Sequence, residues 1–185
     1  MKKEDFILFS GGAKGAEAEF GMNAERFGIE EVNFTFEGHN IVRERGLRVL
    51  NHEELKSGDV SLEYVSRLMY RRFTDNPMFR KILQTIWYQI NNGQEIYVIG
   101  QILGDKTVKG GTGWGAEFAK LCNKPLYVFD QKRGAWFAWN EVDWVERKKG
   151  DEPIINHVHF AGTGTRFIDE NGRNAVKELM ARTFS

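Results

Sequence analysis

The stretch K-G-G-T-G-W-G-A-E, residues 109–117, places four glycines in six positions at the start of a helical pattern. The apolar run E-I-Y-V-I-G at 95–100 precedes it and predicts a buried strand, and P-L-Y-V-F-D at 125–130 predicts a second one. Glycines let the backbone turn tightly and approach a ligand closely. The helix predicted at 114–121 would add unpaired N–H groups and the positive end of its dipole, which suit phosphate. The stretch therefore predicts a strand–loop–helix unit with a nucleotide site at its loop.

The same arrangement occurs near both ends of the chain. The apolar run at 6–9 leads into S-G-G-A-K-G and a helix predicted at 16–27, which Gly28 would end. The run H-V-H-F at 157–160 leads into A-G-T-G-T-R, followed by a helix at 169–182 capped by Asp169 or Asn171. In open α/β sheets, ligands bind at the carboxyl ends of the strands. We therefore expect the three glycine loops to converge on one edge.

The remaining patterns complete an α/β domain. Alternation predicts a strand at 31–36, and His39 follows it as either a ligand contact or a loop residue without a role. Helical spacing predicts helices at 61–73, capped by Ser61, and at 78–91. The polar segment 43–59 is expected to be irregular. These elements predict a Rossmann-like, three-layer α/β fold with a mostly parallel central sheet.

A small aromatic β-hairpin is predicted within residues 131–146, which carry three tryptophans. Core packing and contact with a ligand or partner both fit this segment. We expect one domain over residues 1–185, with 131–150 as a hairpin and linker insertion.

Composition narrows the function classes. Lys plus Arg and Asp plus Glu both number 26, so the zero net charge argues against a general nucleic-acid binder. Cys122 is the only cysteine, which excludes an intrachain disulfide and multi-cysteine zinc sites. His157 and His159 have no third histidine or cysteine nearby, so we expect no metal site. No apolar run is long enough for a signal peptide or a membrane span, and we expect a cytoplasmic protein that binds no membrane and no cofactor.

The glycine loops at 10–15, 110–117 and 162–166 resemble those of the SLOG superfamily. These Rossmann-like nucleotide-binding domains include the LOG phosphoribohydrolases, DprA-type domains and molybdenum-cofactor carriers. The LOG signature is a proline followed by G-G-x-G-T-x-x-E; Gly110, Gly111, Gly113 and Glu117 match it, while Lys109 replaces the proline and Trp114 the threonine. The pair Arg80-Lys81 is similar to the LOG Arg-Lys pair but lies further from the glycine loop.

The chain is more similar still to an uncharacterised bacterial and phage group of the same superfamily. The shared segments lie at 10–17, 34–39, 87–88, 110–115, 124–131 and 161–166 and span nearly the whole chain. The resemblance implies the fold and nucleotide binding, and LOG-like relatives imply a homo-oligomer.

The first functional hypothesis is a protein that binds a small phosphorylated nucleotide, derived from ADP-ribose or cyclic. It would act as a sensor, a carrier or a phage-type sponge that sequesters immune signalling nucleotides. The expected ligand-binding residues are Ser10, Gly11, Gly12, Lys14, His39, Trp87, Gly110, Gly111, Thr112, Gly113, Trp114, Gly162, Gly164, Thr165 and Arg166. Backbone N–H groups, Lys14 and Arg166 would bind phosphates, and a tryptophan or Tyr88 would stack on the base.

Two alternatives remain open. A LOG-like N-glycosidic phosphoribohydrolase would use Glu117 to stabilise the oxocarbenium-like state and Arg80 to hold the phosphate. The alternative for Glu117 is a structural carboxylate in the first turns of a helix, where the dipole favours it. The third hypothesis is a scaffold that assembles through the tryptophan hairpin.

Overall fold

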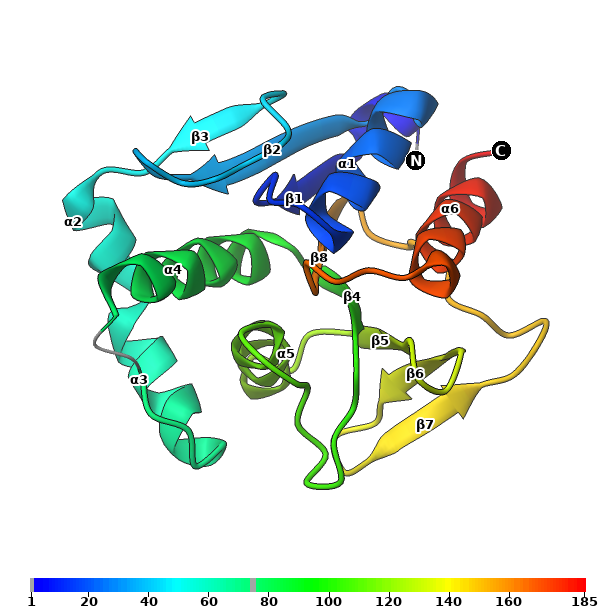
Figure 1. Cartoon of the computed structure of the whole chain (residues 1–185). Coiled ribbons are helices and arrows are strands. Elements are labelled where there is room, and N and C mark those ends of the chain that lie inside the picture. Colours follow the sequence, from blue (N-terminus) through cyan, green and yellow to red (C-terminus); the bar gives the residue numbers. More distant parts are fainter. Residues whose placement is uncertain (1, 74–75) are drawn as a thin grey trace.

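Five parallel and two antiparallel pairings join eight strands into one mixed sheet in the computed structural model, which describes residues 2–73 and 76–185 (Figure 1). The sheet order is β3-β2-β1-β8-β4-β5-β6-β7. The strands are β1 Ile7–Ser10, β2 Glu30–Thr35, β3 Leu47–Val49, β4 Glu95–Gly100, β5 Leu126–Asp130, β6 Ala135–Trp139, β7 Trp144–Arg147 and β8 His159–Gly164. Every residue of β4 is buried, as expected of a central parallel strand covered on both faces.

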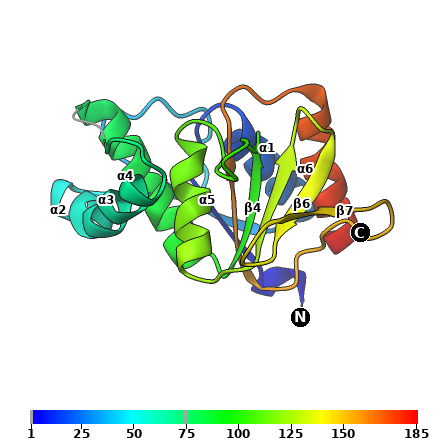
Figure 2. The same cartoon turned by 90° about the horizontal axis from the view of Figure 1, so that it is seen from below.

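Helices cover both faces of the sheet, which gives three layers (Figure 2). The helices are α1 Ala16–Phe27, α2 His52–Leu55, α3 Asp59–Leu68, α4 Pro77–Asn92, α5 Thr112–Leu121 and α6 Glu170–Phe184, with short 3-10 turns η1 Lys3–Asp5 and η2 Lys56–Gly58. Helices α1 and α6 pack together over one core, which includes Phe20 and Leu179. Helices α3, α4 and α5 cover the other core, which includes Leu62 and Leu83. The predicted Rossmann-like α/β fold is therefore confirmed.

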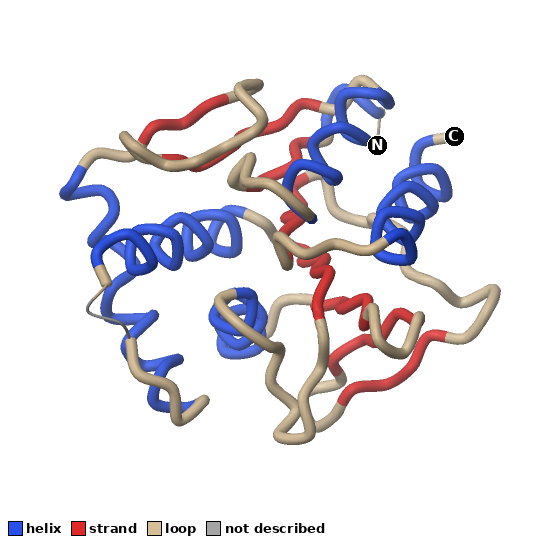
Figure 3. The backbone as a smooth tube through the Cα atoms, viewed as in Figure 1, coloured by secondary structure: helices blue, strands red, loops and turns tan. Residues whose placement is uncertain are grey.

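The chain runs outward from the centre of the sheet in two directions. Strand β1 leads through α1 to β2, whereas β4 leads through α5 to β5 on the other side, and β8 lies between β1 and β4 (Figure 3). Such a reversal of strand order is where open α/β sheets form their ligand crevice. A ligand site is therefore expected at the carboxyl ends of β1, β8 and β4.

Residues 43–59 are more ordered than their polar sequence predicts. They contain β3, which pairs with β2, and α2, whose cap Asn51 accepts hydrogen bonds from Glu53 N and Glu54 N. All three side chains of β3 are exposed, so this edge strand carries none of the burial pattern that signals a strand.

Helix α3 also differs from its predicted bounds. It begins at Asp59 with Gly58 as its N-cap residue, so Ser61 lies inside the helix rather than at its cap. It ends at Leu68 because the chain turns at Tyr70, whose φ of 53° is left-handed.

Strand β8 extends through Gly164, four residues past the predicted end at 160. Gly162 is therefore a strand residue and not part of a loop. A Cβ at Gly162 would lie 2.4 Å from Phe20 Cγ, so its lack of a side chain makes room for α1. The predicted aromatic hairpin is present as β6 and β7, paired antiparallel. The single-domain span 1–185 stays a prediction, and its residues 1, 74 and 75 lie outside the described part.

Candidate functional site

The loops that follow β1 and β8 touch at the carboxyl edge of the sheet. Ala16 N donates to Thr165 O over 3.0 Å. Gly15 has a φ of 104°, and a Cβ there would lie 2.3 Å from Arg166 Cα, so only glycine permits this approach. Lys14 and Arg166 are both exposed on these loops. Two of the three predicted glycine loops thus come together, and each presents a cation.

A buried carboxylate lies beneath this contact. Glu17 is 7% exposed, and its oxygens accept hydrogen bonds from Ala13 N (3.1 Å), Gln89 Nε2 (2.9 Å) and Thr163 Oγ1 (3.2 Å). Burial raises the pKa of Glu17, and these three hydrogen bonds act in the opposite direction. A Cβ on Gly11 would lie 2.6 Å from both Glu17 Oε2 and Gln89 Nε2, so the turn rests directly on this pair.

The sequence prediction missed Glu17 and Gln89 as parts of this edge. Glu17 lies in the G-A-E end of the first glycine motif, which was a usable signal. Gln89 is one polar residue of an amphipathic helix, and helical periodicity does not show that α4 directs it toward another element.

Several of the expected ligand residues hold neighbouring strands together. Ser10 is fully buried and its Oγ donates to Gly162 O over 2.7 Å, which ties β1 to β8. A Cβ on Gly164 would lie 2.3 Å from Ile99 O, so this glycine serves the close contact between β8 and β4. The structure of the edge therefore depends on Ser10, Gly162 and Gly164. The side chains at its surface are those of Lys14, Thr165 and Arg166.

The segment after β2 folds onto the first glycine loop. Gly12 O accepts hydrogen bonds from Val42 N (2.9 Å) and Arg43 N (3.2 Å). His39 lies near the carboxyl end of β2, where its ring stacks on Phe36 at a centroid distance of 4.5 Å. Its Nδ1 is 3.1 Å from Thr35 Oγ1, and burial lowers the pKa of His39, which favours the neutral ring at neutral pH.

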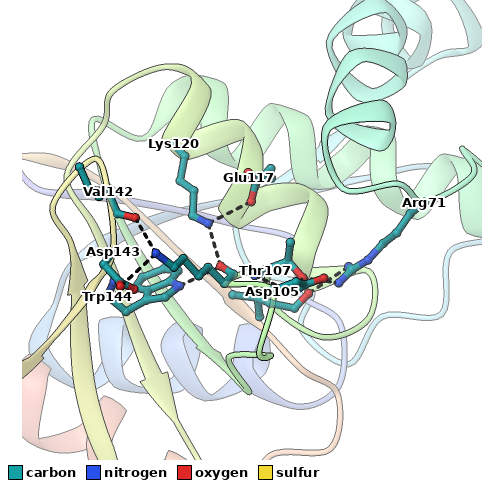
Figure 4. Close-up of polar contacts among 10 residues, drawn as sticks. Arg71, Asp105, Thr107, Glu117, Lys120, Val142, Asp143 and Trp144 are labelled. Atoms are coloured by element: carbon teal, nitrogen blue, oxygen red, sulfur yellow. Dashed lines mark hydrogen bonds and ion pairs between the residues drawn. The ribbon is translucent and has the colours of Figure 1, made fainter.

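An arginine that the sequence placed on a helix holds the middle glycine loop. Arg71 donates to Val108 O (3.0 Å), Gly110 O (3.1 Å) and Thr107 Oγ1 (2.8 Å), directly before α5 (Figure 4). A Cβ on Gly111 would lie 3.2 Å from Phe79 Cε2 of α4. The loop that leads into α5 is therefore fixed by α4 and by the segment that follows α3.

The two tryptophans expected to stack on a base pack inside the protein. Trp114 is 5% exposed and its Nε1 donates to Ser66 Oγ over 2.9 Å. Trp87 stacks on Phe118 at a centroid distance of 6.0 Å with the rings inclined by 27°, and a Cβ on Gly58 would lie 2.4 Å from the Trp87 ring. The stacking role of the two tryptophans stays a prediction, and in the structure both side chains pack against the core between α3, α4 and α5.

The two candidate catalytic side chains are directed to different partners. Glu117 pairs with Lys120 over 3.1 Å, on the side of α5 that faces the hairpin (Figure 4). Arg80 pairs with Asp59 over 2.8 Å, and Gln84 donates to the same carboxylate. The residues around Arg80 line a cavity of ≈ 280 Å³: His52, Leu55, Lys56, Asp59, Pro77, Arg80, Lys81 and Gln84. The structure does not assemble the Glu–Arg pair that the LOG resemblance implies.

The aromatic hairpin is fastened to α5 and to the loop before it. Lys120 Nζ lies 3.9 Å from the centre of the Trp139 ring and 5.0 Å from that of Trp144, a cation–π arrangement. Trp144 Nε1 and Lys120 Nζ both donate to Lys106 O, while Lys106 pairs with Asp143 over 3.0 Å (Figure 4). Trp136 is buried in the core. All three hairpin tryptophans therefore make contacts within the protein, and Trp139 and Trp144 remain partly exposed.

The described part of the chain also bears on other classes of site. No group of three or more His, Cys, Asp or Glu side chains there is arranged to hold a metal ion. Among the helices that the structure describes, none is long and apolar enough to cross a membrane.

The fold has a known counterpart. A crystal structure from Syntrophus aciditrophicus SB, provisionally described as a molybdenum carrier protein, matches 100% of this chain and 98% of its own with a TM-score of 0.55. The two sequences are 13% identical, so the likeness shows a shared fold alone. No protein-family model matches the chain, and no curated protein matches its sequence.

Proposed function

We propose that this protein binds a small phosphorylated nucleotide at the carboxyl edge of β1 and β8, without turning it over. The observation that carries the proposal is the contact between the loops at 10–15 and 165–166, on which Lys14 and Arg166 are exposed. Backbone N–H groups of a glycine turn and a nearby guanidinium are the donors that phosphate oxygens accept. The contact lies at the reversal of strand order, where ligands of open α/β sheets bind.

The proposed ligand class follows from the charge of the edge. Two cations on adjacent loops suit two phosphates, so a pyrophosphate such as that of ADP-ribose or a cyclic dinucleotide fits better than a nucleoside. The structural counterpart's description as a carrier protein supports a role in which a small ligand is held. Sensing, carrying and phage-type sequestration all require such holding, and the proposal extends to any of the three in a homo-oligomer.

The test is to mix the protein with AMP, ADP-ribose, NAD and cyclic dinucleotides. Thermal shift and calorimetry measure binding, and chromatography of the mixtures detects any product. We expect one or more of these nucleotides to raise the melting temperature without forming a product. Lys14→Ala and Arg166→Ala should each weaken binding by about 10–100-fold, because a hydrogen bond to a charged group contributes about 1.5–3 kcal/mol.

Lys149→Ala is the matched control, since Lys149 is also an exposed lysine but lies after β7 at the far end of the sheet. Equal losses in all three variants would reveal only general charge attraction and would contradict the site. Release of free base that Glu117→Gln abolishes would instead establish the phosphoribohydrolase. The absence of a shift with every nucleotide would favour the scaffold.

A further inference from the structure

The groups that donate hydrogen bonds to Glu17 are all neutral. Its carboxylate meets Ala13 N–H from the first glycine turn, Thr163 from β8 and Gln89 from α4. Lys14 on the turn and Arg166 after β8 are exposed, and on α4 Arg80 pairs with Asp59 while Lys81 lies over the Phe36 ring. A buried carboxylate held only by neutral groups is costly to ionise, since burial penalises its charged form.

Gln89 carries an unused acceptor at the same place. Its side chain is fully buried, its Nε2 donates to Glu17, and its Oε1 has no hydrogen-bond partner among the described residues. Turning the amide by half a rotation exchanges the two atoms and sets Oε1 against Glu17 Oε1. In that arrangement a protonated Glu17 donates its O–H to Gln89 Oε1, and Glu17 Oε2 still accepts from Ala13 N.

The first glycine turn lies directly on this pair, because a Cβ added to Gly11 would come within 2.6 Å of Glu17 Oε2. A phosphate bound to that turn would bring negative charge close to Glu17. A second negative charge in a buried, low-dielectric place opposes the first, and proton uptake removes the opposition.

We propose that Glu17 is the positioning residue of the first glycine turn, and that it takes up one proton when an anion binds there. The proton comes from solvent and ends on Glu17 Oε1, so binding of the anion and protonation of the carboxyl favour one another. This inference rests on the proposed function, because it concerns the same edge.

ADP-ribose is the probe, because its pyrophosphate has no terminal phosphate group that titrates near pH 6. For the unmodified protein we expect the affinity to weaken as pH rises through the raised pKa of Glu17, by at most about tenfold per pH unit for one proton. Glu17→Gln is neutral at every pH and keeps the shape. It should bind more tightly than the unmodified protein at high pH and lose that part of the pH dependence.

The Ala13 amide distinguishes the positioning of the turn by Glu17 from the effect of the Glu17 charge on binding. The Ala13 amide signal in ¹⁵N NMR should shift with pH in the unmodified protein and stay constant in Glu17→Gln. Glu17→Ala should weaken the protection of that amide against hydrogen exchange, and Glu17→Gln should restore it. Equal pH dependence of binding and of the Ala13 signal in Glu17→Gln and in the unmodified protein would overturn the inference.

The two proposals fail in different ways. If ADP-ribose and the other nucleotides bind neither the unmodified protein nor Glu17→Gln, the proposed function fails. The pH dependence of the Ala13 amide signal then tests whether Glu17 carries a proton and positions the turn. A pH-dependent shift that is absent in Glu17→Gln supports this role. A flat signal in the unmodified protein refutes it.

Discussion

The raised pKa of Glu17 predicts how the free energy of unfolding depends on pH. Its pKa is raised in the folded protein, so the fold holds a proton in the pH range between the ordinary value of 4.5 and the raised value, where the unfolded chain has released it. The free energy of unfolding therefore falls as pH rises through this range and levels off above it. The free energy of unfolding of Glu17→Gln should not fall in this way. The stability of Glu17→Gln relative to the unmodified protein should therefore increase as pH rises from 4.5 to the raised pKa.

Denaturant titrations of both proteins over a series of pH values measure this difference. Glu19→Gln is the control, because Glu19 lies on the same helix but has a cationic partner, Arg173, at 2.8 Å. A gap between Glu17→Gln and the unmodified protein that stays constant with pH would contradict a raised pKa at Glu17.

Residue roles at the edge show where sequence reasoning stops. The glycine motifs predicted turns that approach a ligand closely, which stays a prediction; in the structure Gly15 closely approaches the neighbouring loop. Which group is approached depends on packing: Arg166 backbone meets Gly15, whereas Phe20 fills the space over Gly162. Glu117 matched a signature in spacing, yet its carboxylate pairs with Lys120, which the hairpin tryptophans contact. Spacing along a chain fixes a residue's place on a helix but not the partner opposite it.

At the scale of elements, Ser66 of α3 and Trp114 of α5 make a hydrogen bond that is tested by one substitution. Ser66→Ala leaves the buried indole N–H of Trp114 without its acceptor. An unsatisfied buried donor costs about 1–3 kcal/mol, so we expect the free energy of unfolding to fall by that amount. Denaturant unfolding monitored by tryptophan fluorescence measures it.

Ser61→Ala on the same helix is the matched control. Because α3 begins at Asp59 and Ser61 is not its cap, the change should alter stability by less than about 0.5 kcal/mol. A loss near 1 kcal/mol in Ser61→Ala, the usual cost of removing a helix cap, would restore Ser61 to that role.

The elements that sequence predicted well carry local signals. Helix α1 and strand β4 have the predicted bounds, because a glycine ends the helix and an unbroken apolar run marks a strand buried on both faces. Strand β3 and helix α2 were missed, since a three-residue exposed edge strand and a single capped turn leave too short a pattern. The end of β8 was misplaced because its small residues are typical of a loop, whereas they serve the packing of α1.

At the scale of the whole molecule, one sheet is shared by two cores. The core under α1 and α6 and the core under α3, α4 and α5 lie on opposite faces of the same strands. The hairpin is hydrogen-bonded to β5 through β6 and fastened to α5 through Lys120. Unfolding of one core would disrupt the strands that the other core needs. We therefore predict one cooperative unfolding transition for residues 1–185.

Calorimetry tests this prediction by comparing the calorimetric and van't Hoff enthalpies, which should agree. Ligand binding adds a second measure, because the glycine loops lie at the ends of the central strands and a ligand there stabilises the whole cooperative unit. A nucleotide at one hundred times its dissociation constant should add about 2.7 kcal/mol, which is a rise of about 5–10 °C for a chain of this size. Two separate transitions, or a shift confined to one of them, would show instead that the hairpin or one core unfolds on its own.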